Sequence, residues 1–256
     1  MKKAILAVSY GTVNAQARAR SVEAFEQALR EAFPEYEVRR AFTGRRMREM
    51  AKKQGIPADS VEEALAGLVR DGFEEVAIQP SHVIGGNEFD SIGEAAEAFR
   101  GSLKRLVIGK PLLWDRTDLA AVCRLLHDAL DADDAELVIM GHGSEHSANS
   151  LYTDFADVCR ALGYSRMHIA TLESTPTLDD LLPELRASGR TKITLTPLLF
   201  AAGDHACRDM AGDGPDSWKS RLEAEGFSVK PVVTGLGEYP GIRALYTAHM
   251  KAAVGG

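Results

Sequence analysis

The chain has 256 residues, enough for two domains of ordinary size or one large domain with a substantial core. Its formal net charge of -7, from 37 acidic and 30 basic side chains, excludes the broad positive surface that nucleic-acid binding requires. The apolar run 4–8 is too short for a signal-peptide core, and no run approaches the roughly 20 apolar residues of a membrane span. We therefore expect a soluble protein that binds neither nucleic acid nor membranes, and the sequence leaves a homo-oligomer open.

The cysteine content favours a reducing compartment. Cys123, Cys159 and Cys207 are odd in number and widely spaced, which suits reduced thiols better than a disulfide framework. We expect a cytoplasmic protein, or a periplasmic one if a leader has been removed from the chain.

Apolar strands alternate with amphipathic helices from one end of the chain to the other. Strands are predicted at 4–9, 37–42, 75–79, 103–108, 137–140, 167–172, 193–200 and 229–233. Helices are predicted at 15–33, 61–70, 91–99, 119–130, 150–162, 178–188, 218–225 and 241–253. This alternation predicts an α/β protein with parallel sheets that are covered by helices on both faces.

The two halves of the chain match at their strand ends. SYGT at 9–12 corresponds to GHGS at 141–144, and Ala41-Phe42-Thr43 corresponds to Thr171-Leu172-Glu173. The later matches are Pro80 with Pro197, Gly86 with Gly203, Asn87 with Asp204 and Glu88 with His205. We infer two similar Rossmann-like domains, 1–113 and 114–240, with the final helix 241–256 joined to the first and the active-site cleft between them.

The strand ends of the second half carry a candidate metal site. His142 follows a continuous apolar strand, and Gly141 and Gly143 leave its imidazole accessible to a flat ligand. Glu173 and His205 follow the next two strands, and adjacent parallel strands end at the same edge of a sheet. Two imidazoles and a carboxylate form a usual ligand set for a divalent first-row metal ion with open positions. The alternative is three unrelated polar residues, because no short metal motif such as HExxH or CxxC is present.

The first half offers polar strand ends and a basic segment. Tyr10, His82 and Glu88 lie at its strand exits. The segment 45–53 contains Arg45, Arg46, Arg48 and Lys52, and forms either a solvated helix face or a binding surface for ligand carboxylates. The glycine turn at 235–238 lacks the third glycine of a dinucleotide site, so no nucleotide is expected.

Several segments together resemble the anaerobic sirohydrochlorin cobaltochelatase (CbiK-type) family of the class II chelatases. These segments are SYGT, HVIGGNEF, MGHGSEHSA, the LES turn at Leu172, TPLLFAAGDHACRDMAGD and GLGEYPGIRALY. The resemblance implies two similar α/β domains beside a tetrapyrrole cleft, and ATP-independent insertion of Co²⁺ into sirohydrochlorin in anaerobic cobalamin biosynthesis.

The resemblance also implies roles for individual residues. His142, Glu173 and His205 take the places of the family's metal ligands, and the two histidines also accept protons. Glu88 matches an acidic catalytic position on the opposite wall of the cleft. The tetrapyrrole is expected to bind Tyr10, Arg45, Arg46 and His82.

Three alternatives remain open from the residues. The same ligands suit Fe²⁺ and Ni²⁺, so a ferro- or nickel-chelatase acting on the same ring is one of them. A non-catalytic carrier of the metal or the tetrapyrrole is the second. A metallohydrolase is the third, although the sequence shows no oxyanion device and no carboxylate cluster for a second metal.

Overall fold

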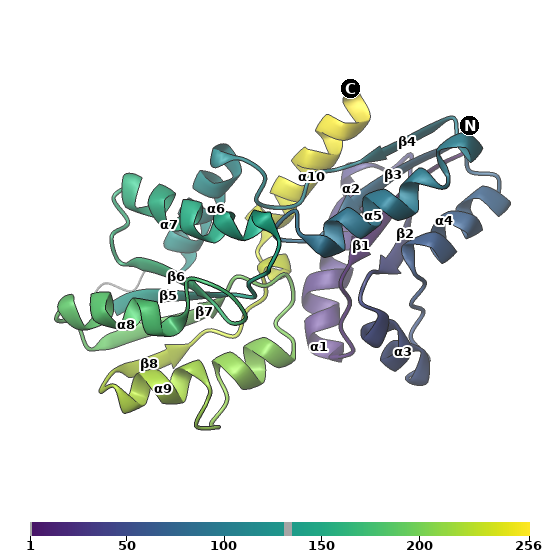
Figure 1. Cartoon of the computed structure of the whole chain (residues 1–256). Helices are drawn as coiled ribbons and strands as arrows, with labels where there is room; N and C mark the ends of the chain where they lie inside the picture. Colours follow the sequence, from purple (N-terminus) through teal and green to yellow (C-terminus); the bar gives the residue numbers. More distant parts are fainter. Residues whose placement is uncertain (1, 131–134) are drawn as a thin grey trace. The chain divides into compact units, whose positions relative to one another are not determined.

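The computed structural model describes residues 2–130 and 135–256, and these form two compact units. One unit comprises Met1–Trp114 and Gly237–Gly256, and the other comprises Asp115–Leu236. Each contains one four-stranded, all-parallel sheet, with strand orders β2-β1-β3-β4 and β6-β5-β7-β8 (Figure 1). The α/β class and the parallel sheets are therefore confirmed, and the two units share one topology.

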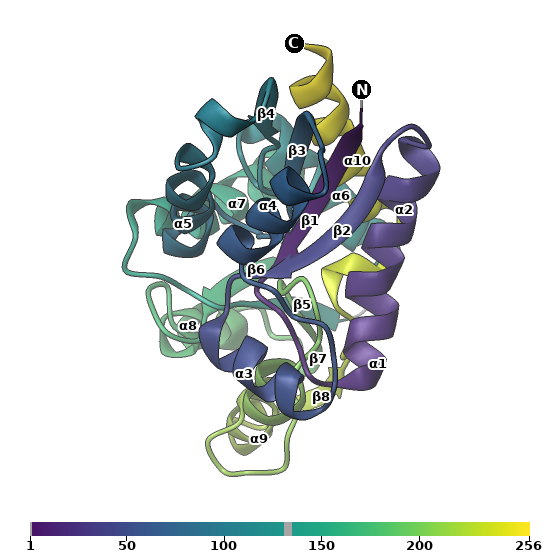
Figure 2. The same ribbon diagram turned by 90° about the vertical axis from the view of Figure 1, so that its right-hand side faces the viewer.

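The first unit places helices on both faces of its sheet. Its strands are β1 (Lys3–Ser9), β2 (Glu37–Phe42), β3 (Glu75–Pro80) and β4 (Arg105–Ile108). Its longer helices are α2 (Ala24–Ala32), α3 (Arg45–Lys53), α4 (Val61–Arg70), α5 (Asn87–Glu97) and α10 (Pro240–Gly255). Helices α4 and α5 bury the apolar side chains of β1 and β3 on one face, while α2 and α10 lie on the other (Figure 2).

The C-terminal helix α10 is anchored to the first unit by a buried tyrosine. The Tyr246 hydroxyl donates a hydrogen bond to the Ser81 carbonyl at 2.7 Å, and its ring packs edge-on against Phe25 of α2 at a centroid distance of 5.3 Å. Because Ser81 directly follows β3, this helix supports the backbone at one of the predicted site loops.

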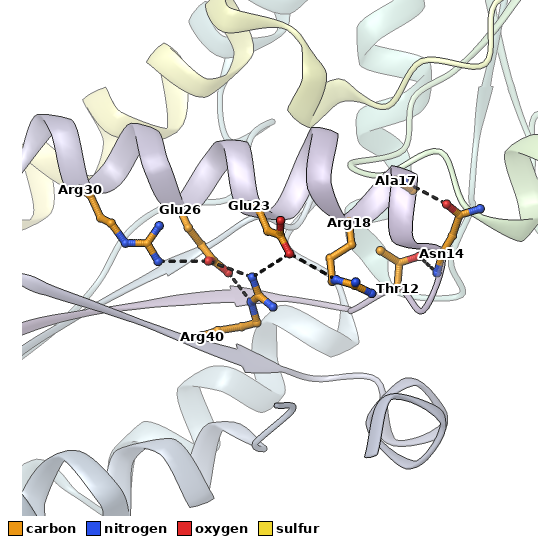
Figure 3. Close-up of polar contacts among 8 residues, drawn as sticks. All are labelled: Thr12, Asn14, Ala17, Arg18, Glu23, Glu26, Arg30 and Arg40. Atoms are coloured by element: carbon orange, nitrogen blue, oxygen red, sulfur yellow. Dashed lines mark hydrogen bonds and ion pairs between the residues drawn. The ribbon is translucent and has the colours of Figure 1, made fainter. Parts of the chain in front are cut away.

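A charged network joins helix α2 to strand β2. Glu26, only 3 % exposed, binds the Arg40 guanidinium through both carboxylate oxygens and also pairs with Arg30 (Figure 3). Glu23 pairs with both Arg40 and Arg18, which extends the network along the helix. A buried carboxylate needs such partners because charge is costly to remove from water.

The second unit repeats this arrangement. Its strands are β5 (Ala135–Gly141), β6 (Met167–Thr171), β7 (Lys192–Pro197) and β8 (Ser228–Pro231). Its longer helices are α6 (Arg116–Leu130), α7 (Ser150–Ala161), α8 (Leu178–Ala187) and α9 (Trp218–Ala224). Helices α6 and α7 lie on one face of the sheet, while α8 and α9 cover the other with a buried cluster that includes Trp218 and Leu222 (Figure 1).

The strand registers confirm the internal repeat and correct one of its residue matches. Val8 pairs with Pro80 in the first sheet, and Met140 pairs with Pro197 in the second, as the sequence match requires. The register also pairs Ser9 with Phe42 and Gly141 with Thr171. The match of Thr43 with Glu173 is therefore wrong by one residue.

The residue that corresponds to Glu173 is Gly44. The Gly44 amide donates to the Tyr10 carbonyl at 3.0 Å, just as the Glu173 amide donates to the His142 carbonyl at 2.9 Å. A Cβ on Gly44 would lie 2.6 Å from the Tyr10 carbonyl oxygen, so no larger side chain fits there. The first unit consequently has a tyrosine and a glycine where the second has His142 and Glu173.

Two helical segments have π geometry, which the sequence periodicity did not predict. The expected helix 15–33 consists of α1 (Ala15–Ala17), the π-helix η1 (Arg18–Glu23) and α2. A second π-helix, η4 (His205–Met210), begins at the predicted metal ligand His205. π-Turns are rare and are frequently found at functional sites.

The expectation of three reduced thiols is wrong for two of the cysteines. Cys123 of α6 and Cys159 of α7 form a disulfide with a Cα–Cα distance of 5.9 Å, because the two helices pack together across 36 residues of sequence. Cys207 remains a free, exposed thiol. Cysteine content therefore gives no argument for a reducing compartment.

Among the residues that the structure describes, no helix combines the length and the apolar character that a bilayer crossing needs.

Candidate metal centre

His142 follows β5 and lies between two glycines, Gly141 and Gly143, at positions where no larger residue fits. A Cβ on Gly141 would lie 2.4 Å from the ring of Tyr152, so α7 packs directly against the strand end. Gly143 has a φ of +89°, and a Cβ there would lie 2.8 Å from the Ser174 amide nitrogen. The two glycines therefore allow the loop to pack closely against its own unit. The sequence analysis explained them differently, by the access of a flat ligand to His142.

Glu173 is carried beside His142 by backbone pairing that continues past the ends of β5 and β6. The Leu172 amide donates to the Gly141 carbonyl at 3.0 Å, and the Glu173 amide donates to the His142 carbonyl at 2.9 Å. Asn149 holds the same loop by donating to the Thr175 carbonyl at 2.7 Å. The backbone of Glu173 is therefore held by continued strand pairing, and its Oε2 atom lies 3.8 Å from His142 Nδ1.

The predicted ligands His142, Glu173 and His205 come together at this edge of the second sheet. Their donor atoms all lie within 4.8 Å of one another, and no metal-like cluster of three His, Cys, Asp or Glu side chains is found elsewhere among the described residues. Two donors bonded at about 2.1 Å to one tetrahedral ion lie about 3.4 Å apart. The most widely separated of the three donors would therefore close by up to about 1.4 Å to share an ion.

The two imidazoles are arranged edge to face and remain open to a ligand. Their ring centroids are 5.1 Å apart with an interplanar angle of 84°. The side chains of His142, Glu173 and His205 are 43 %, 55 % and 42 % exposed. An ion held here would keep coordination positions free for a second reactant.

Each imidazole has its Nδ1 atom held by an acceptor. His142 Nδ1 lies 3.0 Å from the Gly143 carbonyl oxygen, and His205 Nδ1 lies 2.7 Å from Asp209 Oδ2. A carbonyl oxygen only accepts hydrogen bonds, so Nδ1 of a neutral His142 carries the proton and Nε2 carries the lone pair. The same assignment follows for a neutral His205 that donates to an ionised Asp209.

Asp209 is ionised in this setting. Burial alone would raise the pKa of its carboxyl, but hydrogen bonds from Arg208 and His205 outweigh burial and lower that pKa. Sequence analysis missed Asp209, and its position four residues after His205 in a helical segment was the available signal. It also missed Tyr152, whose buried hydroxyl bonds to the backbone at His142 and Gly143.

The predicted ring-binding residues of the first unit lie at its own strand ends. Tyr10 follows β1 and is 50 % exposed, with its ring over Gly44. His82 follows β3, and its Nε2 atom lies 3.3 Å from Thr43 Oγ1 at the end of β2. Glu88 is exposed in the first turn of α5.

The basic segment forms helix α3, and its arginines differ in role. Arg48 donates to the backbone carbonyls of Phe42 at 2.9 Å and Thr43 at 2.5 Å, so it holds the end of β2 rather than contributing to the predicted binding surface for ligand carboxylates. Arg45 is highly exposed and pairs with Glu49 at 3.1 Å. Arg46 is also exposed on this helix.

His82 gives a measurable pH dependence of stability. Burial lowers its pKa from 6.5 to about 4, and its Nδ1 atom is enclosed without a hydrogen-bond partner. Between these two pKa values the unfolded chain binds a proton that the folded protein does not, so stability is lost as the pH falls from about 6.5 to about 4. The loss expected from this residue is about 2–3 kcal/mol.

Urea unfolding at pH 7.0 and pH 4.5 measures this effect. The variant His82→Gln has no titrating ring, so its unfolding free energy should fall less on acidification than that of the parent protein. Equal losses in the two proteins would show that His82 is not the buried neutral group described above.

Comparison with known proteins places this chain beside metal chelatases. A family model described as "Cobalt chelatase (CbiK)" matches residues 3–255. The sirohydrochlorin cobaltochelatase of Salmonella typhimurium is 36% identical over 257 residues, covering 99% of this chain and 97% of that protein. The sirohydrochlorin cobaltochelatase CbiKC of Nitratidesulfovibrio vulgaris is 38% identical over 258 residues, covering 99% and 91%.

Solved structures show the same fold at lower sequence identity. SirB from Bacillus subtilis with Fe³⁺ aligns with a TM-score of 0.67 at 18% identity, covering 99% of this chain and 96% of that one. The sirohydrochlorin chelatase SirB from Bacillus subtilis subspecies spizizenii in complex with cobalt aligns with a TM-score of 0.64 at 17% identity, with the same coverage. At these identities the likeness concerns the fold alone.

Proposed function

The chain belongs to the cobalt chelatase (CbiK) family, and we propose that it inserts Co²⁺ into sirohydrochlorin without a nucleotide. Two relatives that share more than a third of its residues over nearly the whole chain are named for this reaction. The observation that carries the proposal is the cluster of His142, Glu173 and His205 at one sheet edge.

The ligand set suits a metal ion that must be released again. Imidazole nitrogens and a carboxylate bind Co²⁺, Fe²⁺ and Ni²⁺ alike, so the site admits all three and supply in the cell selects among them. Three protein ligands leave positions where ring nitrogens can replace water. A metal held by exposed ligands is loose enough to transfer.

Insertion also requires that two pyrrole N–H protons leave the ring as the metal enters. In this proposal His142 and His205 offer neutral Nε2 atoms that accept protons once the ring nitrogens have taken over the metal. Glu173 balances the charge of the ion, and Glu88 of the first unit serves as a further acidic catalytic group. Each proton acceptor thus becomes available as its bond to the metal is lost.

Ring binding is assigned to the first unit. Sirohydrochlorin is a polycarboxylate and the protein carries a net charge of -7, so the ring needs a local cationic surface. Arg45 and Arg46 are exposed on α3 and supply that surface in the proposal. Tyr10 and His82 provide ring contacts at the ends of β1 and β3.

The test is to mix purified protein with Co²⁺ and sirohydrochlorin under anaerobic conditions and follow the absorption spectrum. The proposal expects metal insertion well above the rate without protein, unaffected by added or removed ATP. No acceleration would contradict it, and ring binding without insertion would identify a carrier instead. Parallel reactions with Fe²⁺ and Ni²⁺ rank the metals.

A further inference from the structure

We propose that Asp209 is a positioning residue that fixes His205 for metal binding, an inference that rests on the proposed metal site. Asp209 Oδ2 lies 2.7 Å from His205 Nδ1, and both residues belong to the π-helix η4. The contact engages Nδ1 of His205, so Nε2 is the ring nitrogen that remains to bind an ion. Nε2 of His205 is then the ligand atom.

The geometry of η4 makes this contact a fixed feature of the fold. The Ala211 amide donates to the Ala206 carbonyl at 3.2 Å, a step of five residues that defines the π-turn. Residues four apart lie on one side of such a turn, so His205 and Asp209 face each other. Asp209 is 26 % exposed and therefore partly shielded from water that would compete for its oxygens.

Both oxygens of Asp209 are engaged. Oδ1 accepts from Arg208 Nε at 3.0 Å, which leaves Oδ2 for His205. The Arg208 side chain is 76 % exposed, and such surface pairs contribute little energy. The 2.7 Å contact to His205 is therefore the contact of Asp209 that has consequences for the metal.

The two imidazoles are consequently supported in different ways. His142 has the neutral Gly143 carbonyl as its acceptor, at 3.0 Å, whereas His205 has a carboxylate. A carboxylate behind a histidine fixes its tautomer and strengthens its other nitrogen as a ligand, and removal of such a partner typically costs 10–100-fold in metal affinity. We infer that His205 is the stronger of the two imidazole ligands because of Asp209.

The chain offers a matched control. Asp213 follows the same π-helix, pairs with Lys219 at 2.7 Å and is 93 % exposed. Asp213→Asn also removes one negative charge, three residues beyond the end of η4, but it leaves both imidazoles and their partners unchanged. Asp209→Asn keeps the size and an accepting oxygen but removes the charge, and Asp209→Ala removes both.

Titration of the full-length variants with Co²⁺ in the absence of ring, followed by visible absorption, tests the inference. Asp209→Ala should bind Co²⁺ about 10–100-fold more weakly, Asp209→Asn should fall between, and Asp213→Asn should match the parent protein. Nitrogen-15 NMR of the histidine rings should show the Nδ1–H tautomer of His205 in the metal-free parent and its loss in Asp209→Ala. A purely structural role for Asp209 would not change that tautomer.

Failure of this inference differs from failure of the metal site. If Asp209→Ala and the parent bind Co²⁺ equally, while His205→Ala binds it poorly, Asp209 has no positioning role and the site stands. If His205→Ala binds Co²⁺ as tightly as the parent, His205 is not a metal ligand, and the positioning role of Asp209 is then also incorrect. If Asp209→Ala does not fold, the Asp209→Asn titration and NMR spectrum decide the question.

Discussion

Replacing His205 or His142 by alanine is expected to slow Co²⁺ insertion by about 100–10,000-fold, the range for loss of a positioned proton acceptor. Both imidazoles lie in the three-residue cluster, and each has Nδ1 engaged, which leaves Nε2 for the metal and for a proton. Sirohydrochlorin affinity should change little, because the ring is assigned to the first unit. The measurements are single-turnover insertion rates and ring binding by fluorescence quenching.

A control for this experiment is His127→Ala. His127 lies on α6 and stacks on Tyr164 at a ring distance of 3.8 Å, outside the three-residue cluster. Its loss should leave insertion within about two-fold of the parent rate, since His127 is half-buried and is not one of the three clustered ligands. Full turnover in either His142→Ala or His205→Ala would remove that residue from the mechanism.

Replacing Glu26 by alanine is expected to lower the free energy of unfolding by about 3–5 kcal/mol, a large share of the roughly 5–15 kcal/mol typical of a protein. Glu26 is 3 % exposed and binds Arg40 of β2 through both oxygens (Figure 3). Its removal leaves the Arg40 guanidinium, whose side chain is 20 % exposed, without its closest counter-charge.

Urea unfolding of Glu26→Ala beside Glu31→Ala measures the difference. Glu31 lies on the same helix, is exposed and only accepts a hydrogen bond from Gln27, so its loss should cost about 0.5 kcal/mol or less. Equal effects of the two substitutions would mean that the network in Figure 3 adds nothing to the stability of the first unit.

Much of the fold could be predicted because hydrophobic strands leave a strong pattern. The run that ends at Gly141-His142-Gly143 forms β5, and the ordered matches between the halves anticipated two sheets of one topology. The predicted strand 193–200 was too long, since β7 ends at Pro197, whose ring removes a ladder donor. Likewise β8 ends at Pro231 rather than at Val233.

Other features depend on contacts that a linear pattern does not contain. The one-residue error at Glu173 arose because apolar runs mark a strand but not its exact register with a neighbour. The Cys123–Cys159 disulfide depends on the packing of α6 on α7, and Arg48 binds carbonyls that only the folded turn presents. The π-helix that begins at His205 has only six residues, too few for its hydrophobic pattern to differ recognisably from that of an α-helix.

X-ray absorption of the Co²⁺-loaded protein tests most directly whether His142, Glu173 and His205 hold the metal that is inserted. We predict the scattering pattern of two imidazole rings with Co–N and Co–O distances of about 2.0–2.2 Å. The spectra of His142→Ala and His205→Ala should each show the scattering of one imidazole ring instead of two. A spectrum without imidazole scattering, or one that neither substitution changes, would show that these residues do not bind the metal.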